Sequence, residues 1–240
     1  MGVDTVKLAY DLRPLCDSLD CGWGDTSALA DGCSGWNMGK RYGSTGPVHW
    51  QEWVNEDNGL RVTVKGVRGR PTMLWEGSLP KLLGVAGVVE PETVRILDRY
   101  LRGLVPGIGQ PRVRRLDLTH DVLDFNGSVR RAALGWNPHA RSRYVQADYQ
   151  GGQTVWQHNK SRGVRVYDKY EECGESWAMG LTRIEYQMRG DWCGKVGCGH
   201  LHSRFGEYAR AALEPLVLSL LERVGQEEGG SDAGRVVSAL

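Results

Sequence analysis

Three segments of the sequence alternate apolar and polar residues, and this period of two predicts β-strands rather than helices. They are residues 112–121 (RVRRLDLTHD), 163–171 (GVRVYDKYE) and 181–190 (LTRIEYQMRG). Further strands are expected at 3–10, 60–66, 71–77 and 152–159. Strands that follow one another with few long helices between them indicate an α+β fold with a central antiparallel sheet. We expect helices to cover one face of this sheet and to leave the other face open.

Two longer helices are expected. Residues 91–104 place an apolar stripe on one face, with Pro91 at the first helical position. A second helix, from about 204 to 223, is expected to be bent or broken by Pro215. A short helix is expected in the segment GSVRRAALGW, which follows the strand at 112–121.

The chain length of 240 residues suits one domain, expected at 1–224. An irregular Gly- and Trp-rich insertion is expected at about 20–50, and the Cys- and Trp-rich stretch 16–53 has no assigned role. The polar, glycine-rich residues 225–240 are expected to form a flexible tail. The apolar run LEPLVLSLL is too short to cross a membrane, and MGVDTVKLAYDL lacks the features of a signal peptide, so a cytoplasmic protein is expected.

The formal net charge of +1 does not by itself indicate a polyanionic partner. Arginines are nevertheless concentrated between residues 112 and 143, and the guanidinium fork suits phosphate oxygens. This set is Arg112, Arg114, Arg115, Arg130, Arg131, Arg141 and Arg143. Either a DNA-binding surface or an ordinary solvated basic face explains it.

The alternation also assigns faces to the three strands. In each strand the apolar residues belong to the core, and the polar residues share the opposite face. Asp117, Tyr167 and Glu185 fall on these polar faces and are expected to meet if the strands are neighbours. Two carboxylates can supply oxygen ligands to Mg²⁺ or Mn²⁺, and a tyrosine beside a cation can lose its proton and attack phosphorus. Ordinary cross-strand ion pairs are the alternative explanation of the same pattern.

Four blocks of the sequence resemble the replication initiators of filamentous phages, the gene II protein family, and the related plasmid initiators of rolling-circle replication. The blocks are WEGSLPKLLG (75–84), RRLDLTHDV (114–122), QTVWQHNKSRGVRVYDKYEE (153–172) and LTRIEYQMRGDW (181–192). The resemblance runs from the first strand to about residue 192. It implies a metal-dependent endonuclease that nicks one strand of a double-stranded origin, stays joined to the 5′ end through tyrosine, and later rejoins the ends.

The resemblance also implies roles for particular residues. Tyr167 matches the nucleophile, and Asp117 and Glu185 match the ligands of one divalent ion, Mg²⁺ or Mn²⁺. Asp121 matches a second acid found in the plasmid branch. The groups expected to serve the phosphate are Arg165 and Lys169. Lys81, in the EGSLPKLLG turn, is a candidate phosphate contact, and a buried structural turn is the alternative. Origin DNA, single-stranded DNA and a host helicase are the expected partners, and a homodimer stays open.

Several alternatives remain. A conjugative or mobilisation relaxase would use the same chemistry, and a non-catalytic relative would keep only DNA binding. His200 and His202 form a His-hydrophobe-His motif, but Tyr208 follows too closely for a strand, a turn and a helix to aim at one metal. With Cys193 and Cys198 the same histidines have the ligand types for zinc, although not a familiar spacing.

The other tyrosines are assigned by position. Tyr186 and Tyr170 fall on inward faces by the alternation of their strands. Tyr144 and Tyr149 lie in a basic segment expected to be a loop, where stacking on an unpaired base is an alternative to no function.

Overall fold

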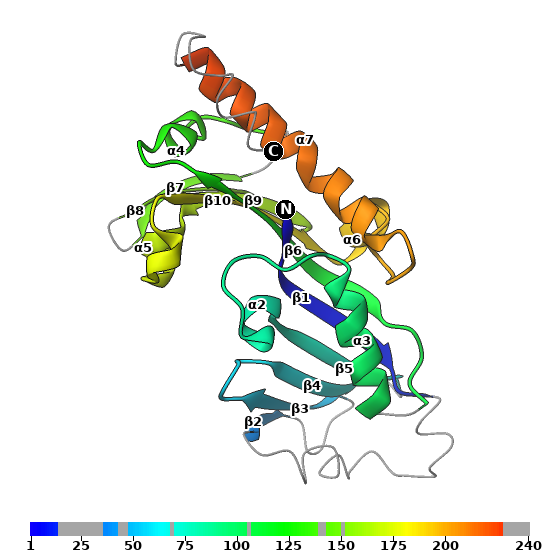
Figure 1. Cartoon of the computed structure of the whole chain (residues 1–240). Helices are drawn as coiled ribbons and strands as arrows, with labels where there is room; N and C mark the ends of the chain where they lie inside the picture. Colours follow the sequence, from blue (N-terminus) through cyan, green and yellow to red (C-terminus); the bar gives the residue numbers. More distant parts are fainter. Residues whose placement is uncertain are drawn as a thin grey trace.

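The computed structural model describes residues 1–13, 36–42, 48–67, 70–104, 107–138, 143–149 and 152–227. In this part of the chain ten strands form one antiparallel sheet in the order β2-β3-β4-β5-β1-β6-β10-β9-β8-β7 (Figure 1). The strands are β1 (Gly2–Asp11), β2 (Trp36–Tyr42), β3 (Val48–Asn55), β4 (Arg61–Val67), β5 (Arg70–Ser78), β6 (Arg112–Leu123), β7 (Arg143–Tyr149), β8 (Gly152–His158), β9 (Arg162–Asp168) and β10 (Leu181–Arg189). The α+β fold with a central antiparallel sheet, expected from the sequence, is confirmed.

The helices in the described residues are short, except for the two longer helices α3 and α7. They are α2 (Leu79–Leu83), α3 (Thr93–Leu104), α4 (Ser128–Ala132), α5 (Lys169–Cys173), the 3-10 turn η2 (Ser176–Ala178), α6 (Asp191–Lys195) and α7 (Phe205–Glu227). None of the helices in the described residues is long and apolar enough to cross a membrane.

The apolar residues of the central strands share one face of the sheet. Leu116 of β6 lies opposite Val6 of β1, and Ile184 of β10 lies opposite Val166 of β9. These side chains are buried, and they belong to one continuous cluster that reaches Val224 near the end of α7. The alternation seen in the sequence therefore assigned the core face correctly.

Helices cover this apolar face along most of the sheet. α4 and α7 lie over the half formed by β6–β10, and α3 lies beside β1 and β5 (Figure 1). α3 docks through Val94, Leu97 and Leu101, which are buried. The short helix α5 lies on the other side of the sheet, away from α4 and α7 (Figure 1).

A β-bulge at Arg114 marks the middle of the sheet. Lys7 of β1 pairs with Arg115, but the next residue, Leu8, pairs with Val113, so β6 has one extra residue there. Bulges locally increase twist and re-aim side chains, and they are frequent beside active sites. The bulge directs Arg115 to the polar face and Val113 to the core.

Several details differ from the expectation. The strand expected at 163–171 ends at Asp168, because the Asp168 side chain accepts hydrogen bonds from the backbone N–H groups of Tyr170 and Glu171 and caps α5. α3 begins at Thr93, and Pro91 lies in the turn before it. α7 continues through Pro215 as one helix, so the helix expected to be bent or broken there is not broken.

The predicted boundaries also shift. Residues 36–42 and 48–55 are strands β2 and β3, so the insertion expected at about 20–50 is regular in these parts. The basic segment expected to be a loop contains strand β7. α7 extends to Glu227, beyond the expected boundary at 224, and the rest of the expected tail lies outside the described residues.

Candidate active site

The polar face of the sheet brings the predicted residues together. Its cross-strand pairs are Asp117–Gln187, Asp121–Arg183, Tyr167–Arg183 and Arg165–Glu185. Asp117, Tyr167 and Glu185 come from three separate segments, and the order β6-β10-β9 makes these segments neighbours. The proximity that the sequence required of these three residues is therefore present.

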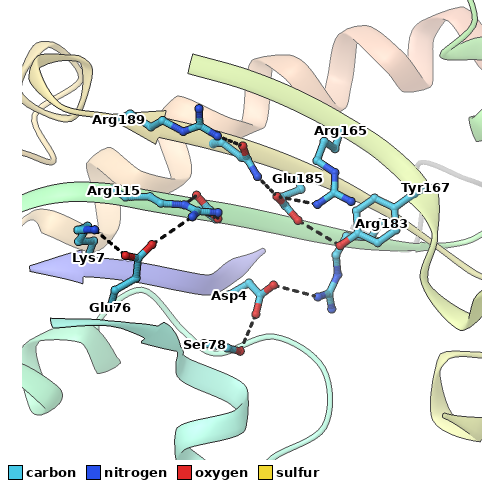
Figure 2. A network of polar contacts seen from close by, with 12 residues as sticks. Asp4, Lys7, Glu76, Ser78, Arg115, Arg165, Tyr167, Arg183, Glu185 and Arg189 are labelled. Carbon is cyan, nitrogen blue, oxygen red and sulfur yellow. Dashed lines mark hydrogen bonds and ion pairs between the residues drawn. The ribbon is translucent and has the colours of Figure 1, made fainter. Parts of the chain in front are cut away.

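Tyr167 is held by a carboxylate. Its hydroxyl donates a hydrogen bond to Glu185 Oε2 at 3.1 Å (Figure 2). Burial raises the pKa of the phenol, the negative charge of Glu185 raises it further, and the positive charge of Arg183 opposes the rise. Glu185 is thus in place to accept the phenolic proton, and Arg183 favours the phenolate that remains.

Asp117 is the second buried carboxylate. It is 2% exposed and accepts a bidentate interaction from Arg115, with Arg115 Nη2 2.6 Å from Asp117 Oδ2. Burial raises the pKa of Asp117 to about 7, and the neighbouring charge of Glu185 also raises it, against the effect of Arg115. Two carboxylates in a dry site repel each other, so this position favours a proton or a cation.

Asp121 has a different partner from the other acids. Arg183 donates two hydrogen bonds to it, from Nε at 2.6 Å and from Nη2 at 2.7 Å. Burial lowers the pKa of Arg183, but the hydrogen bonds and charge of Asp121 outweigh burial and raise it, so the guanidinium keeps its charge at 1% exposure. Both oxygens of Asp121 are engaged, and its position favours the role of fixing Arg183 over that of a metal ligand.

Two residues predicted to serve the phosphate lie in different settings. Arg165 lies over the Tyr167 ring, 4.7 Å from its centroid, and its Nη1 is 3.6 Å from Glu185 Oε1. Lys169, by contrast, lies on α5 rather than on β9, and its Nζ is 2.5 Å from Glu172 Oε2. The sequence assigned Arg165 and Lys169 to the same face of one strand, and this prediction is wrong for Lys169.

The polar face is closed rather than open. Lys7 and Arg115 both bind Glu76 of β5, at 2.6 and 3.2 Å (Figure 2). Arg115 also covers Asp117. Glu185 and Tyr167 are 3% and 4% exposed. Arg115 covers Asp117 and Arg165 lies over the Tyr167 ring, so the face expected to be open is closed at the site.

Sequence reasoning placed Arg183 and Gln187 on the polar face but gave them no role. Gln187 donates from Nε2 to Glu185 Oε1 at 2.6 Å and accepts from Arg189 Nη2 at 2.8 Å. It therefore fixes the carboxylate that binds Tyr167. The only available signal was the alternation itself, which does not distinguish a network residue from a solvated one.

The carboxylate pair has the donor chemistry for a divalent cation. Mg²⁺ is commonly held by one or two carboxylates, with water and substrate phosphate completing its shell. Asp117 and Glu185 supply two such carboxylates, and burial together with the charge of Glu185 raises the pKa of Asp117. Within the described residues, no three His, Cys, Asp or Glu side chains converge on one point.

The predicted DNA-binding residues divide into two groups. Arg112, Arg114, Arg131 and Lys81 are exposed. Arg115 belongs to the carboxylate network, and Arg130 pairs with Asp168 at 2.7 Å. Arg141 lies outside the described residues, as does the side chain of Arg143, which begins β7.

The Cys and His cluster near the carboxyl end is packed rather than ligand-like. Cys193 and Cys198 are buried, and burial raises the pKa of each thiol to about 12. His202 Nε2 lies 2.8 Å from the carbonyl oxygen of Gly197, and its ring packs edge-on against Tyr208. No three of Cys193, Cys198, His200 and His202 group closely enough to hold a metal ion.

The remaining tyrosines separate clearly. Tyr186 is buried in the core, as expected, and its hydroxyl accepts a hydrogen bond from Trp192 Nε1 at 2.7 Å. Tyr170 is 37% exposed, so the inward assignment was wrong, because the residue lies on α5 and not on a strand. The side chains of Tyr144 and Tyr149, both in β7, lie outside the described residues.

Comparisons with known proteins find a structural similarity. The chain is similar to the structure of a rolling circle replication initiator protein from Geobacillus stearothermophilus, with a TM-score of 0.50 and 16% identity, over 92% of this chain and 83% of that one. At this identity the similarity concerns the fold. A 72-residue stretch is 24% identical to the E3 ubiquitin-protein ligase COP1 of Arabidopsis thaliana, covering 30% of this chain and 10% of that protein. No protein-family model matches the chain.

Proposed function

We propose that the protein is a rolling-circle replication initiator, a site-specific endonuclease that nicks one DNA strand through a covalent 5′-phosphotyrosine. The observation that carries this proposal is the hydrogen bond from the Tyr167 hydroxyl to Glu185, beside a second buried carboxylate and a buried arginine. The fold similarity to a replication initiator supports the same function. The four sequence blocks point more narrowly to the gene II family of filamentous phages or its plasmid relatives.

In the proposed reaction Tyr167 attacks the scissile phosphorus. Its proton passes to Glu185 Oε2, the phenolate oxygen bonds to phosphorus, and the bond to the 3′-oxygen breaks. The leaving 3′-oxygen takes up a proton, from Glu185 or from water, and becomes a 3′-hydroxyl. Because the phosphotyrosine keeps the energy of a phosphodiester, a later 3′-hydroxyl can reverse the step and rejoin the ends.

The protein groups around the tyrosine have separate roles. Arg183 stabilises the phenolate, and Asp121 fixes Arg183 by its two hydrogen bonds. Arg165 lies over the phenol ring and is partly exposed, so it can turn toward an entering phosphate. Lys169 is bound to Glu172, so phosphate contact by Lys169 requires that ion pair to open.

A divalent ion, Mg²⁺ or Mn²⁺, would be held by Asp117 and Glu185. When bound it would polarise the phosphate and offset its developing charge. Arg115 now occupies the Asp117 oxygens and is only partly buried, so it can withdraw to Glu76, which it already contacts. These two carboxylates are also the groups whose mutual repulsion a cation would relieve.

The proposal is tested by covalent capture. A pool of random-sequence single-stranded oligonucleotides, labelled at the 3′ end, is incubated with the protein and Mn²⁺ and separated under denaturing conditions. We expect label on the wild-type protein and none on Tyr167→Phe, whereas the matched control Tyr170→Phe should be labelled normally. A wild-type protein that takes up no label would indicate a non-catalytic relative, and labelled Tyr167→Phe would assign the chemistry elsewhere.

A further inference from the structure

The outer face of α3 borders a groove that lies away from Tyr167. The groove has a volume of about 340 Å³. Its lining residues are Glu92, Arg95, Ile96, Asp98, Arg99, Arg102, Gln110 and Leu201. Three of them are arginines at positions i, i+4 and i+7 of one helix, which places them on one side of α3.

The acidic residues of this groove already have partners. Arg210 of α7 binds Glu92 through two nitrogens, with Nη2 2.6 Å from Oε1, and lies 3.4 Å from Glu90. Asp98 accepts hydrogen bonds from the Tyr10 hydroxyl at 3.0 Å and from Arg102 Nε at 3.1 Å. The carboxylates are thus neutralised by groups other than Arg95 and Arg99.

Arg95 and Arg99 are exposed and keep their charge available. Neither guanidinium makes a hydrogen bond or an ion pair with a residue that the structure describes, and the Arg95 side chain acts on Glu92 only through its charge. They are separated by about 6 Å along the helix axis, which is close to two of the roughly 3.4 Å charge spacings of one DNA strand. The exposed Arg112 extends the positive surface, since its backbone pairs with that of His200, next to the lining residue Leu201.

We infer that this groove binds the phosphate backbone of duplex DNA, with Arg95 and Arg99 as the phosphate contacts; the inference rests on the proposed function. Guanidinium groups match phosphate oxygens through paired N–H donors. Single strands are usually held by stacking of bases on aromatic rings, and none of the described residues that line the groove is aromatic. A groove of arginines without a stacking platform therefore favours duplex.

The groove and the candidate active site lie on opposite faces of the sheet. α3 packs against the apolar face through Leu97, and Asp98 bonds Tyr10 of β1, whereas Tyr167 belongs to the polar face. The groove therefore contacts DNA that extends beyond the nick. Cleavage of a short oligonucleotide should not depend on it.

The test compares the salt dependence of duplex binding for the wild type and for Arg95→Gln/Arg99→Gln. Each phosphate contact contributes about 0.9 to the slope of log K against log salt. The double variant should lower this slope by roughly 2 and weaken binding about tenfold or more near 0.1 M salt. Glutamine is a good helix former, so α3 should keep its fold.

Two controls separate local contact from total charge. Arg61→Gln/Arg204→Gln removes the same charge from exposed arginines that do not line the groove and should leave the slope close to that of the wild type. Arg95→Lys/Arg99→Lys keeps the charge and should retain most of the slope while losing part of the affinity.

An unchanged salt slope in Arg95→Gln/Arg99→Gln would overturn the inference. An equal decrease of the slope in the Arg61→Gln/Arg204→Gln control would also overturn it, as would a loss of affinity for single-stranded DNA alone. Labelling of Tyr167 by short oligonucleotides is measured on the same proteins. If the wild type forms no adduct but the slope changes as expected, the proposed nicking function fails while the duplex site stands.

Discussion

Replacing Asp117 by asparagine should make the protein more stable at neutral to alkaline pH, although Asp117 is a candidate metal ligand. Its pKa is raised from 3.8 to about 7, so above pH 7 the folded protein carries a charge that burial and Glu185 disfavour. A difference of about three pKa units corresponds to on the order of 4 kcal/mol. The amide loses the ion pair with Arg115, so we expect a net gain of about 1–4 kcal/mol at pH 8.5.

The sign of the pH dependence follows from the direction of the pKa change. Because the folded pKa lies above the unfolded one, the folded state binds the extra proton between about pH 4 and pH 7. The stability that this proton contributes is present at low pH and is lost as the pH rises through about 7. Part of this contribution is already lost at pH 5.5, so the wild type should lose the rest, on the order of 2 kcal/mol, between pH 5.5 and 8.5, and Asp117→Asn should not.

The assay is chemical denaturation of wild type and variant at pH 5.5 and 8.5, without divalent ions. Asp98→Asn is the matched control, because Asp98 is equally buried but satisfied by Tyr10 and Arg102. This control should lower stability at both pH values. If Asp117→Asn is no more stable than the wild type at pH 8.5, the account of two competing buried carboxylates is refuted.

Two further predictions concern the same network. Mn²⁺ at millimolar concentration should raise the melting temperature of the wild type at pH 8 by several degrees, because it binds the folded state only, and Glu185→Gln should abolish the effect. An equal shift in wild type and Glu185→Gln would place the cation elsewhere. Arg183→Lys should slow adduct formation at least about tenfold and move its pH optimum upward, since the point charge of lysine holds the phenolate less well. Arg189→Lys, which changes a residue bonded to Gln187 on the same face, should not move the pH optimum; identical profiles for wild type and Arg183→Lys would remove Arg183 from this role.

Much of the candidate site was predictable because alternation along a strand is a local property. It assigned Asp117, Tyr167 and Glu185 to the polar face before any strand order was known. It could not show that β10 lies between β6 and β9, since that order depends on packing between distant segments. The closure of the polar face was equally hidden, because it depends on where long side chains such as Arg115 end.

The start of α5 had a local signal in the sequence, but the alternation of the preceding strand outweighed it. Asp168 followed by Glu171 has the spacing of a helix N-cap and its third residue, yet the alternation of the preceding strand was extended through it. Tyr170 was consequently assigned to the wrong environment. The separate roles of Asp117 and Asp121 had no local signal, because only the cross-strand partner distinguishes them: Arg115 and Glu185 surround the first, and Arg183 holds the second.

Peptide mapping of the covalent adduct identifies the residue that is bonded to DNA, which we expect to be Tyr167. Trypsin separates the candidates, because cleavage after Arg165 and after Lys169 gives the peptide Val166–Lys169, with Tyr170 in the next one. After nuclease digestion of the captured adduct, mass spectrometry should find a nucleotide on Val166–Lys169. A nucleotide on the peptide that contains Tyr170, or on any other, would contradict the account.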